Sequence, residues 1–385
     1  MIRAKSGLSI CALVPYPPNT TPSQRFRIEQ WMPYLREAGI GVDLLPFVNE
    51  ELMRMLHQPG LPITKAAHFA MAFARHCSEI TRTYRYDALL IHRTACVAGP
   101  ALLERLVKLF NCPIIYDFDD AIFHLHTTTA NRYFGWLKFP GKTASICRLS
   151  SHVVVGNQYL ADYARQHNAQ VTVIPSSVDT NFYNPRQKKE SQERVIVGWT
   201  GSSTSQTYLE SFAPLLRELL RQREVELHVI SDRRPEMPGV PLHWHRWSPE
   251  TEITDLARFD IGIMPMPDDL WARGKCSMKA LLYMAMGIPT ICSAVGMNRE
   301  VIQHGQNGLL ANTDEEWLHC LKTLIDDVAL RKRLGDAGRK TIEERYSMQR
   351  CAALFANVIR DVVTKHNTQV VNKKWFLLKS KNNAQ

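Results

Sequence analysis

The sequence predicts an α/β protein with two domains, each built on a parallel β-sheet flanked by helices. Strand-like and helix-like segments alternate along the chain, the pattern of parallel sheets with crossover helices. The length of 385 residues is sufficient for two or three domains. A polar run at residues 184–193 separates two such alternating series and predicts a linker. We therefore expect domains over residues 1–187 and 188–365, the final helix packing on the first domain, and a basic tail over 366–385.

The first series opens with an uninterrupted apolar run at residues 8–14, typical of a buried parallel strand. Thr21, Pro22 and Gln24 then match the N-cap, N1 and N3 positions of a helix that Gly39 would end. The remaining elements expected in this half are strands at 42–48, 88–91, 113–117, 152–155 and 171–174, and helices at 65–82, 100–110 and 157–166.

The second series repeats this alternation, so a ligand is expected at the carboxyl ends of the parallel strands, between the two halves. The expected strands are 195–199, 225–230, 241–247, 259–264, 289–293 and 308–311. The expected helices are 207–222, 249–257, 276–286 and 297–304, followed by mostly helix from 314 to about 364.

The net charge of +10 is unevenly distributed along the chain. Residues 1–187 carry 19 basic and 13 acidic side chains (+6), residues 188–350 carry 22 and 23 (−1), and residues 351–385 carry 6 and 1 (+5). A basic first half and tail suit a surface that meets phosphates, whether of anionic lipid, a lipid-linked acceptor or a nucleic acid. An ordinary solvated basic surface is the alternative.

The nine cysteines form no C-x-x-C pair and no His/Cys cluster at zinc spacing. They predict reduced thiols in a cytoplasmic protein without metal ligands. The N-terminal charges and short apolar run resemble a signal peptide, but the run stops at Pro15, so a first strand is expected instead. No apolar run reaches the ~18 residues of a membrane span.

Two motifs in the second half are typical of anion-binding sites. Thr200, Gly201 and Ser202 form a small-residue turn between a strand and a helix, where backbone N–H groups can approach a phosphate; a plain tight turn is the alternative. Lys275 and Lys279 lie four residues apart at a helix start, where two cations are unfavourable unless an anion is near. A solvated lysine pair is the alternative there.

The second half resembles the donor half of GT-B glycosyltransferases of glycosyltransferase family 4, which have two Rossmann-like domains. The resemblance rests on residues 259–265 (FDIGIMP), 275–279 (KCSMK), 283–290 (YMAMGIPT), 293–296 (SAVG) and 300–309 (EVIQHGQNGL), with 173–179 (VIPSSVD) similar to the end of the family's first domain. It extends over roughly residues 8–362 and implies a retaining transfer of sugar from a nucleotide diphosphate sugar.

The chain departs from the family at a pair of glutamates eight positions apart, which contact the sugar and the ribose. Gly274 and Leu282 stand at these positions, and the family's Arg and Lys for the diphosphate have no evident match. Since the departing diphosphate must be neutralised, Arg273, Lys275 and Lys279 are the candidate cations, with Lys275 as a catalytic candidate.

Candidate acceptor-side residues follow two strands and begin the first helix of the first half. Asp117, Asp119 and Asp120 read D-x-D-D, a pattern that holds Mn²⁺ in a different glycosyltransferase fold. Here we expect these carboxylates to orient an acceptor hydroxyl, with Asp119 and Asp120 as catalytic residues. Strand alternation should send Asp120 to the opposite side from Asp117 and Asp119. His92 is a further catalytic candidate. The expected acceptor-binding residues are Arg25, Arg27 and Arg93.

These residues and the resemblance together predict a glycosyltransferase of the hexosyltransferase type that needs no metal or other cofactor. Its expected partners are a nucleotide sugar, a lipid-linked or saccharide acceptor and an anionic membrane surface, but no nucleic acid. The expected setting is bacterial polysaccharide or glycoconjugate synthesis, in the cytoplasm or on the cytoplasmic membrane face. Another GT-B chemistry, such as sugar-nucleotide epimerisation, and a non-catalytic sugar-nucleotide-binding scaffold are the alternatives.

Overall fold

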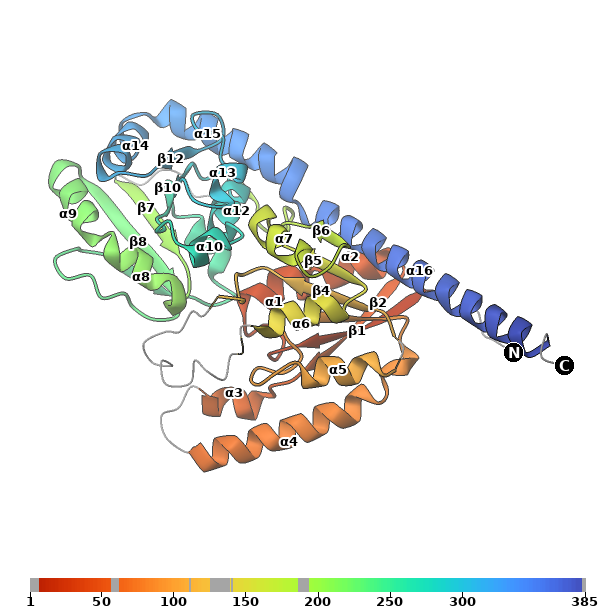
Figure 1. The fold of residues 1–385 in the computed structure, drawn as a ribbon. Coiled ribbons are helices and arrows are strands. Elements are labelled where there is room, and N and C mark those ends of the chain that lie inside the picture. The colour runs from red at the N-terminus through yellow and green to blue at the C-terminus, as the bar shows by residue number, and fades with distance from the viewer. Residues whose placement is uncertain are drawn as a thin grey trace. The chain divides into compact units, whose positions relative to one another are not determined.

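The chain divides into two compact units, described here from a computed structural model (Figure 1). The structure describes residues 7–56, 62–110, 112–124, 139, 141–185 and 194–382. Unit 1 comprises the chain up to Ile174 and from Cys351 onward, and unit 2 comprises Pro175–Arg350. The first unit therefore ends before the expected boundary at residue 187, and residues 186–193 of the expected linker lie outside the described residues.

Unit 1 is built on a six-stranded, all-parallel sheet with the strand order β2-β1-β3-β4-β5-β6. Its strands are β1 (Leu8–Val14), β2 (Ile40–Pro46), β3 (Ala88–His92), β4 (Ile114–Phe118), β5 (His152–Val155) and β6 (Val171–Val173). The side chains of β3 and β4 are buried on both faces, which explains why these strands are apolar apart from His92 and Asp117 near their carboxyl ends. The carboxyl ends of β3 and β4 lie side by side, since His92 pairs with Asp117 in the register.

The helices of unit 1 cover this sheet (Figure 1). They are α1 (Pro22–Arg27), α2 (Met32–Glu37), α3 (Glu50–Leu56), α4 (Pro62–Ile80), α5 (Leu102–Lys108), α6 (Gly141–Leu149) and α7 (Gln158–Arg165), with 3₁₀ turns at Glu29–Trp31 and Thr83–Arg85. Helices α3 and α6 were not predicted. The single helix expected before Gly39 is broken into α1, a 3₁₀ turn and α2, because Pro33 has no N–H to continue the helical hydrogen bonds.

The last helix, α16 (Met348–Asn382), packs on unit 1 with the part that follows Cys351. The Phe355 ring lies 5.2 Å from that of Trp31, and Arg360 Nη2 donates to the carbonyl of Ala38 at 2.7 Å. The tail expected from residue 366 is helical as far as Asn382, and residues 383–385 lie outside the described residues. Among the described helices, none combines the length and apolar character of a membrane span.

Unit 2 is built on a second six-stranded parallel sheet, with the order β12-β11-β10-β7-β8-β9. Its strands are β7 (Val195–Thr200), β8 (Val225–Ser231), β9 (His243–Arg246), β10 (Ile261–Met264), β11 (Thr290–Ser293) and β12 (Leu309–Ala311). Its helices are α8 (Ser203–Ser211), α9 (Ala213–Gln222), α10 (Glu252–Leu256), α11 (Leu270–Arg273), α12 (Met278–Ala285), α13 (Asn298–Val301), α14 (Asp314–Asp326) and α15 (Val328–Thr341), with a π-helical turn at Ile342–Tyr346.

The two faces of the unit 2 sheet have different coverings. On one face, Val197, Leu227 and Val229 pack with apolar residues of α9 and α14 in a single core cluster. On the other, α12 presses so closely on β10 that a Cβ on Gly262 would lie 2.5 Å from the Tyr283 ring. Because successive side chains of a strand point to opposite faces of the sheet, the neighbours of these core residues in β7 and β8 lie on the face opposite the core cluster. Both units confirm the predicted α/β fold of two doubly wound parallel sheets.

Candidate functional site

Lys279 of α12 lies against the turn after β7, at the start of α8. The Thr200 backbone N–H donates to the Tyr283 hydroxyl at 2.8 Å, which ties the end of β7 to α12. A Cβ at Gly201 would lie 2.6 Å from the Lys279 Cε and 2.6 Å from the Trp199 ring, so only glycine leaves room for the lysine here. Lys279 Nζ lies 5.3 Å from the centre of the Trp199 ring and donates to Ser205 Oγ at 3.1 Å. A half-buried ammonium group thus lies against the predicted phosphate turn.

The same turn already holds one carboxylate of the protein. Asp232, which directly follows β8, accepts a hydrogen bond from the Ser203 N–H at 2.6 Å and another from the Ser203 hydroxyl at 2.8 Å. Ser202, the residue before α8, has extended backbone and makes no side-chain cap. Asp232 was not predicted as a site residue, because its position beside Ser203 depends on the pairing of β7 with β8.

The other predicted donor-side cations are arranged differently from expectation. Lys275 precedes α12 rather than lying in its first turn, and its Nζ is 5.1 Å from the centre of the Trp271 ring. It therefore does not share a face with Lys279. Arg273 is exposed and forms an ion pair with Asp268 at 2.7 Å. Lys279 is the predicted cation that the structure brings to the turn after β7.

The loop before α12 is held in a conformation that L-residues seldom adopt. Ser277 has a φ of 53° and donates from its hydroxyl to Asn298 Oδ1 at 2.7 Å, and Asn298 donates in turn to the Ser293 carbonyl at 2.9 Å. Gly296, with a φ of 50°, lies so close to Arg273 that a Cβ would be 2.8 Å from its carbonyl oxygen. Gly274 and Leu282, at the positions of the missing glutamate pair, are both buried, and neither residue carries a carboxylate.

A second polar cluster lies in unit 1 at the carboxyl ends of β3 and β4. Arg27 of α1 and Asp117 of β4 form a fully buried ion pair, and Arg27 also donates to the Ile174 carbonyl. The imidazole of His92 lies between two partners, with Nδ1 2.8 Å from Asp117 Oδ2 and Nε2 3.0 Å from Ser23 Oγ. Burial opposes ionisation of Asp117, but the charge of Arg27 and the contact with His92 lower the pKa of the carboxyl below its usual value.

The outer part of this cluster is less buried. Ser23 donates to Asp119 Oδ1 at 2.6 Å, and Arg93 Nε donates to the same oxygen at 2.9 Å. Arg93 also pairs with Asp120. Burial again opposes ionisation of Asp119, and Arg93, His92 and Arg27 together hold the pKa of this carboxyl well below its usual range. Asp120 lies beyond the end of β4, so strand alternation does not apply to it, and it joins Asp119 on Arg93 instead of pointing away.

Two expectations for the acceptor side change with this geometry. Arg25 and Arg27 lie in the last turn of the short helix α1, where cations are favourable, and not at the start of a long one. Arg27 has no exposed surface and is neutralised by Asp117, so it does not fit the expected contact with an acceptor phosphate. His92 is equally buried, and both of its nitrogens face protein partners, so its catalytic role stays a prediction. Arg93, at 25% side-chain exposure, is more accessible.

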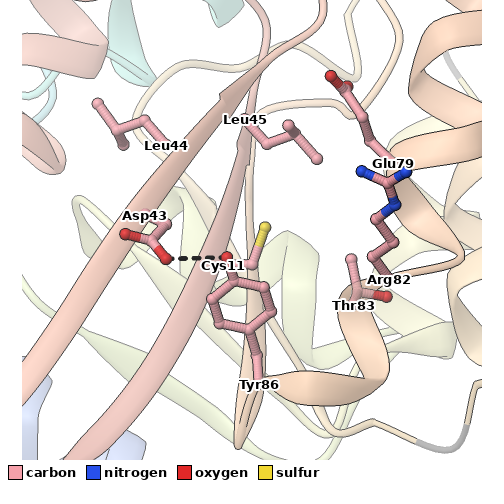
Figure 2. A pocket seen from close by; sticks show the side chains of 8 residues that line it. All are labelled: Cys11, Asp43, Leu44, Leu45, Glu79, Arg82, Thr83 and Tyr86. Carbon is pink, nitrogen blue, oxygen red and sulfur yellow. Dashed lines mark hydrogen bonds between the residues drawn. The ribbon is translucent and has the colours of Figure 1, made fainter.

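A small hollow in unit 1 is lined by residues that belong to neither cluster (Figure 2). It lies beside the middle of β1 and β2, where Tyr86 donates to Asp43 Oδ2 at 2.8 Å (Figure 2). Burial raises the pKa of the Cys11 thiol to about 12, with a smaller contribution from Asp43, so this cysteine is not a nucleophile at neutral pH. The hollow is not at the carboxyl ends of the strands and is not a candidate for the transfer site.

One group of metal-ligand type was missed in the sequence. Glu226 and His228 of β8 lie next to His243 of β9, with their ligand atoms all within 4.8 Å of one another. The signal was present as Glu-x-His and His-x-His, the period of a strand face, but the two pairs are neighbours only because β8 and β9 are adjacent.

Comparison with known proteins agrees with the fold and the motifs. Residues 194–327 match the family model described as glycosyl transferases group 1. The chain is 23% identical over 325 residues to an MMP alpha-(1->4)-mannosyltransferase of Mycolicibacterium hassiacum, with 76% of this chain and 75% of that protein covered.

Solved structures with the same fold cover nearly the whole chain. A glycosyltransferase from Rickettsia africae superposes with a TM-score of 0.64 at 13% identity, covering 93% of this chain and 99% of its own. Sucrose-phosphate synthase from Thermosynechococcus elongatus gives 0.64 at 14% identity, with 93% and 100% covered. Anabaena HepE, solved with UDP-glucose, gives 0.61 at 14% identity, with 92% and 100% covered. With two doubly wound units and these matches, the chain has the GT-B fold, and residues 194–327 of its second unit are similar to group 1 glycosyltransferases.

Proposed function

We propose that the chain transfers a hexose from a nucleoside diphosphate sugar to an acceptor hydroxyl, with retention of configuration at the anomeric carbon. Relatives support the donor class, since one is named a mannosyltransferase and Anabaena HepE was solved with UDP-glucose and with UDP and glucose. In this reaction the bond from the anomeric carbon to the diphosphate breaks, and a bond to the acceptor oxygen forms. The enzyme must therefore stabilise negative charge on the departing diphosphate.

The observation that carries the proposal is the position of Lys279. Its Nζ lies 3.1 Å from Ser205 Oγ in α8, over the Trp199 ring and against Gly201. A diphosphate at the turn of Thr200, Gly201 and Ser202 would meet this ammonium group and the N-terminal end of α8 together. The Lys279 ammonium group thus supplies positive charge that a divalent cation would otherwise supply. We propose that transfer proceeds without such a cation. Arg273 and Lys275 remain additional donor-side candidates.

Unit 1 supplies the residues proposed for the acceptor. Asp119, Asp120 and Arg93 form the more accessible part of its cluster. Arg27 and His92 both contact the buried Asp117, and His92 also contacts Ser23, so they act as positioning residues. Asp119 is kept ionised by its neighbours, so it can accept a hydrogen bond from an acceptor hydroxyl. The +6 charge of residues 1–187 and the +5 of residues 351–385 support an anionic, lipid-linked acceptor at a cytoplasmic membrane surface, as in bacterial polysaccharide or glycoconjugate synthesis.

The test compares Lys279→Ala with the control Lys332→Ala, an exposed lysine on α15 of the same unit. Calorimetric titration with UDP and GDP, followed by transfer assays with a panel of nucleotide sugars, measures binding and turnover. Loss of a charge-assisted contact should weaken binding by about 1 to 3 kcal/mol, that is about 5- to 150-fold, with the control unchanged. The anomeric coupling constant of the product reports retention or inversion.

Three outcomes would contradict parts of the proposal. Equal nucleotide affinity in Lys279→Ala and the wild type removes the phosphate role of this lysine. Binding of a nucleotide sugar without transfer or hydrolysis favours a non-catalytic scaffold. An inverted product rejects retention while leaving the donor site in place.

A further inference from the structure

A cluster of three histidines and one glutamate lies on the outer strands of the unit 2 sheet. Glu226 and His228 alternate along β8, and His243 and His245 alternate along the edge strand β9. The register places His228 opposite His243, so the four side chains share one face of the sheet. This is the face opposite the core cluster that contains Leu227 and Val229.

The distances in this cluster fit a tetrahedral metal ion. His228 Nε2 lies 3.1 Å and His243 Nε2 lies 3.8 Å from the same oxygen of Glu226. Ligand atoms about 2.0–2.2 Å from a tetrahedral zinc ion are about 3.3–3.5 Å from one another, and the two observed separations lie on either side of that value. All three ligand atoms lie within 4.8 Å of one another, and the exposed His243 is the side chain that can move closer to the other two.

A second layer of residues orients the buried ligand. His228 is only 5% exposed, and its Nδ1 lies 3.1 Å from His245 Nε2. The Nδ1 of His245 in turn faces Asp255 Oδ1 at 3.9 Å. If His228 binds a metal through Nε2, its Nδ1–H donates to His245, whose own proton then faces Asp255. Relays of this kind, from a carboxylate through histidine to a ligand, support zinc-binding histidines in many proteins.

We propose that Glu226, His228 and His243 form a zinc-binding site on the outer strands of unit 2. Two imidazoles and one carboxylate are ligands that Zn²⁺ accepts readily, and His243, whose side chain is 62% exposed, leaves a path for the ion and a position for water. The site is separate from the donor turn. His228 precedes Asp232 by four residues, which in an extended strand such as β8 corresponds to roughly 13 Å of backbone. A bound ion joins the short edge strand β9 to β8 and does not take part in sugar transfer.

The test uses untagged full-length protein stripped with EDTA, dialysed, and titrated with zinc chloride alone. Metal content by mass spectrometry and competition with a chromophoric chelator give stoichiometry and affinity. We expect one zinc ion per chain, and affinity at least about 10- to 100-fold lower in His243→Ala. His319→Ala, an exposed histidine on α14 of the same unit, serves as the matched control and should bind as the wild type does.

Cobalt(II) substitution gives a readout that does not depend on affinity. A site with two imidazoles and a carboxylate should give the strong visible bands of four-coordinate cobalt, and Glu226→Gln should shift or abolish them while circular dichroism shows an intact fold. Absence of zinc binding in the wild type at micromolar free metal would overturn the proposal. Equal zinc affinity and unchanged cobalt spectra in His243→Ala and Glu226→Gln would also overturn it, because the ion would then lie elsewhere.

Discussion

Asp232 accepts two hydrogen bonds from Ser203, one from its backbone N–H at 2.6 Å and one from its hydroxyl at 2.8 Å. A protein carboxylate therefore accepts the hydrogen bond of the first N–H of α8. This is the N-terminal end of the helix, where the positive end of the helix dipole favours an anion. In the first turn of the same helix, Lys279 Nζ donates to Ser205 Oγ. The proposed diphosphate site is thus bounded by one negative and one positive side chain.

This relationship predicts that Asp232→Asn binds nucleoside diphosphate more tightly than the wild type. The amide oxygen can still accept from the Ser203 N–H and the amide nitrogen can donate to the Ser203 hydroxyl, while the repulsion between the carboxylate and a phosphate is removed. We expect affinity for UDP or GDP to rise by about tenfold, or 1.4 kcal/mol, as measured by calorimetric titration at low salt. Asp336→Asn, at an exposed position of α15, removes the same charge far along the chain and is the control.

Unchanged or weaker binding in Asp232→Asn would mean that this carboxylate shapes the turn and is not a competitor for the anion. Salt dependence separates the two readings, since a purely electrostatic gain should shrink as ionic strength rises.

The buried pair of Arg27 and Asp117 gives a prediction about stability. Arg27→Met keeps an unbranched side chain of similar length but leaves Asp117 fully buried without its counter-charge. We expect the free energy of unfolding, measured with urea, to fall by about 3–5 kcal/mol. Replacing the surface arginine of an exposed pair, as in Arg221→Met beside Glu218, should change it by less than about 1 kcal/mol.

The ionisation of Asp117 adds a pH signature to the same variant. In the wild type its pKa is lowered, so its contribution to stability is present above the unfolded pKa and is lost as the pH falls through the folded pKa. Without Arg27, burial should raise the pKa of Asp117, and stability should then increase as the pH falls and the carboxyl is protonated. A variant with the same acid dependence as the wild type would show that Arg27 does not hold this charge.

The sequence predicted the strands better than the site, and particular residues show why. The mostly apolar runs of β1, β3 and β4 are short and end at turn residues, which favours buried strands, and these elements were correctly predicted to within one or two residues. The first helix was predicted as continuous because its apolar spacing is regular, and the missing N–H of Pro33 was overlooked.

Site residues were harder to predict because most depend on contacts between distant parts of the chain. Lys275 and Lys279 are four residues apart, yet one approaches Trp271 and the other Trp199, since the chain turns through the left-handed Ser277 between them. Asp232 meets Ser203, and Glu226 meets His243, only through the strand order of the sheet. No local spacing carries that information.

His76 of α4 predicts a loss of stability in mild acid. Its side chain is fully buried beside Phe47, and burial, with a smaller effect of Arg75, lowers its pKa to about 4 even though Glu79 lies 3.4 Å away. The unfolded chain therefore binds a proton more readily between pH 6.5 and pH 4, so stability falls as the pH drops through this window. The loss should reach about 3 kcal/mol by pH 4.

Urea unfolding at a series of pH values tests this in His76→Phe, which cannot be protonated. The variant should lose most of the slope between pH 6.5 and pH 4, whereas the control His319→Gln, at an exposed histidine, should keep it. An unchanged slope in His76→Phe would assign the acid sensitivity to other groups.

Removal of metal ions should separate the transfer reaction from the zinc site proposed on β8 and β9. We expect EDTA to leave the initial rate of sugar transfer intact, because Lys279 and the start of α8 provide the charge that a divalent cation supplies elsewhere. The same treatment should lower the melting temperature of the zinc-loaded protein, since an ion bound only to the folded state stabilises it. His243→Ala should show the low melting temperature with or without EDTA and a normal transfer rate.

If EDTA instead abolishes transfer and Mn²⁺ restores it in both proteins, the metal acts at the donor, and Asp117, Asp119 and Asp120 become the residues to test as its ligands. Restoration by zinc in the wild type but not in His243→Ala would place the ion on β8 and β9 and give it a role in activity that the proposed site does not include.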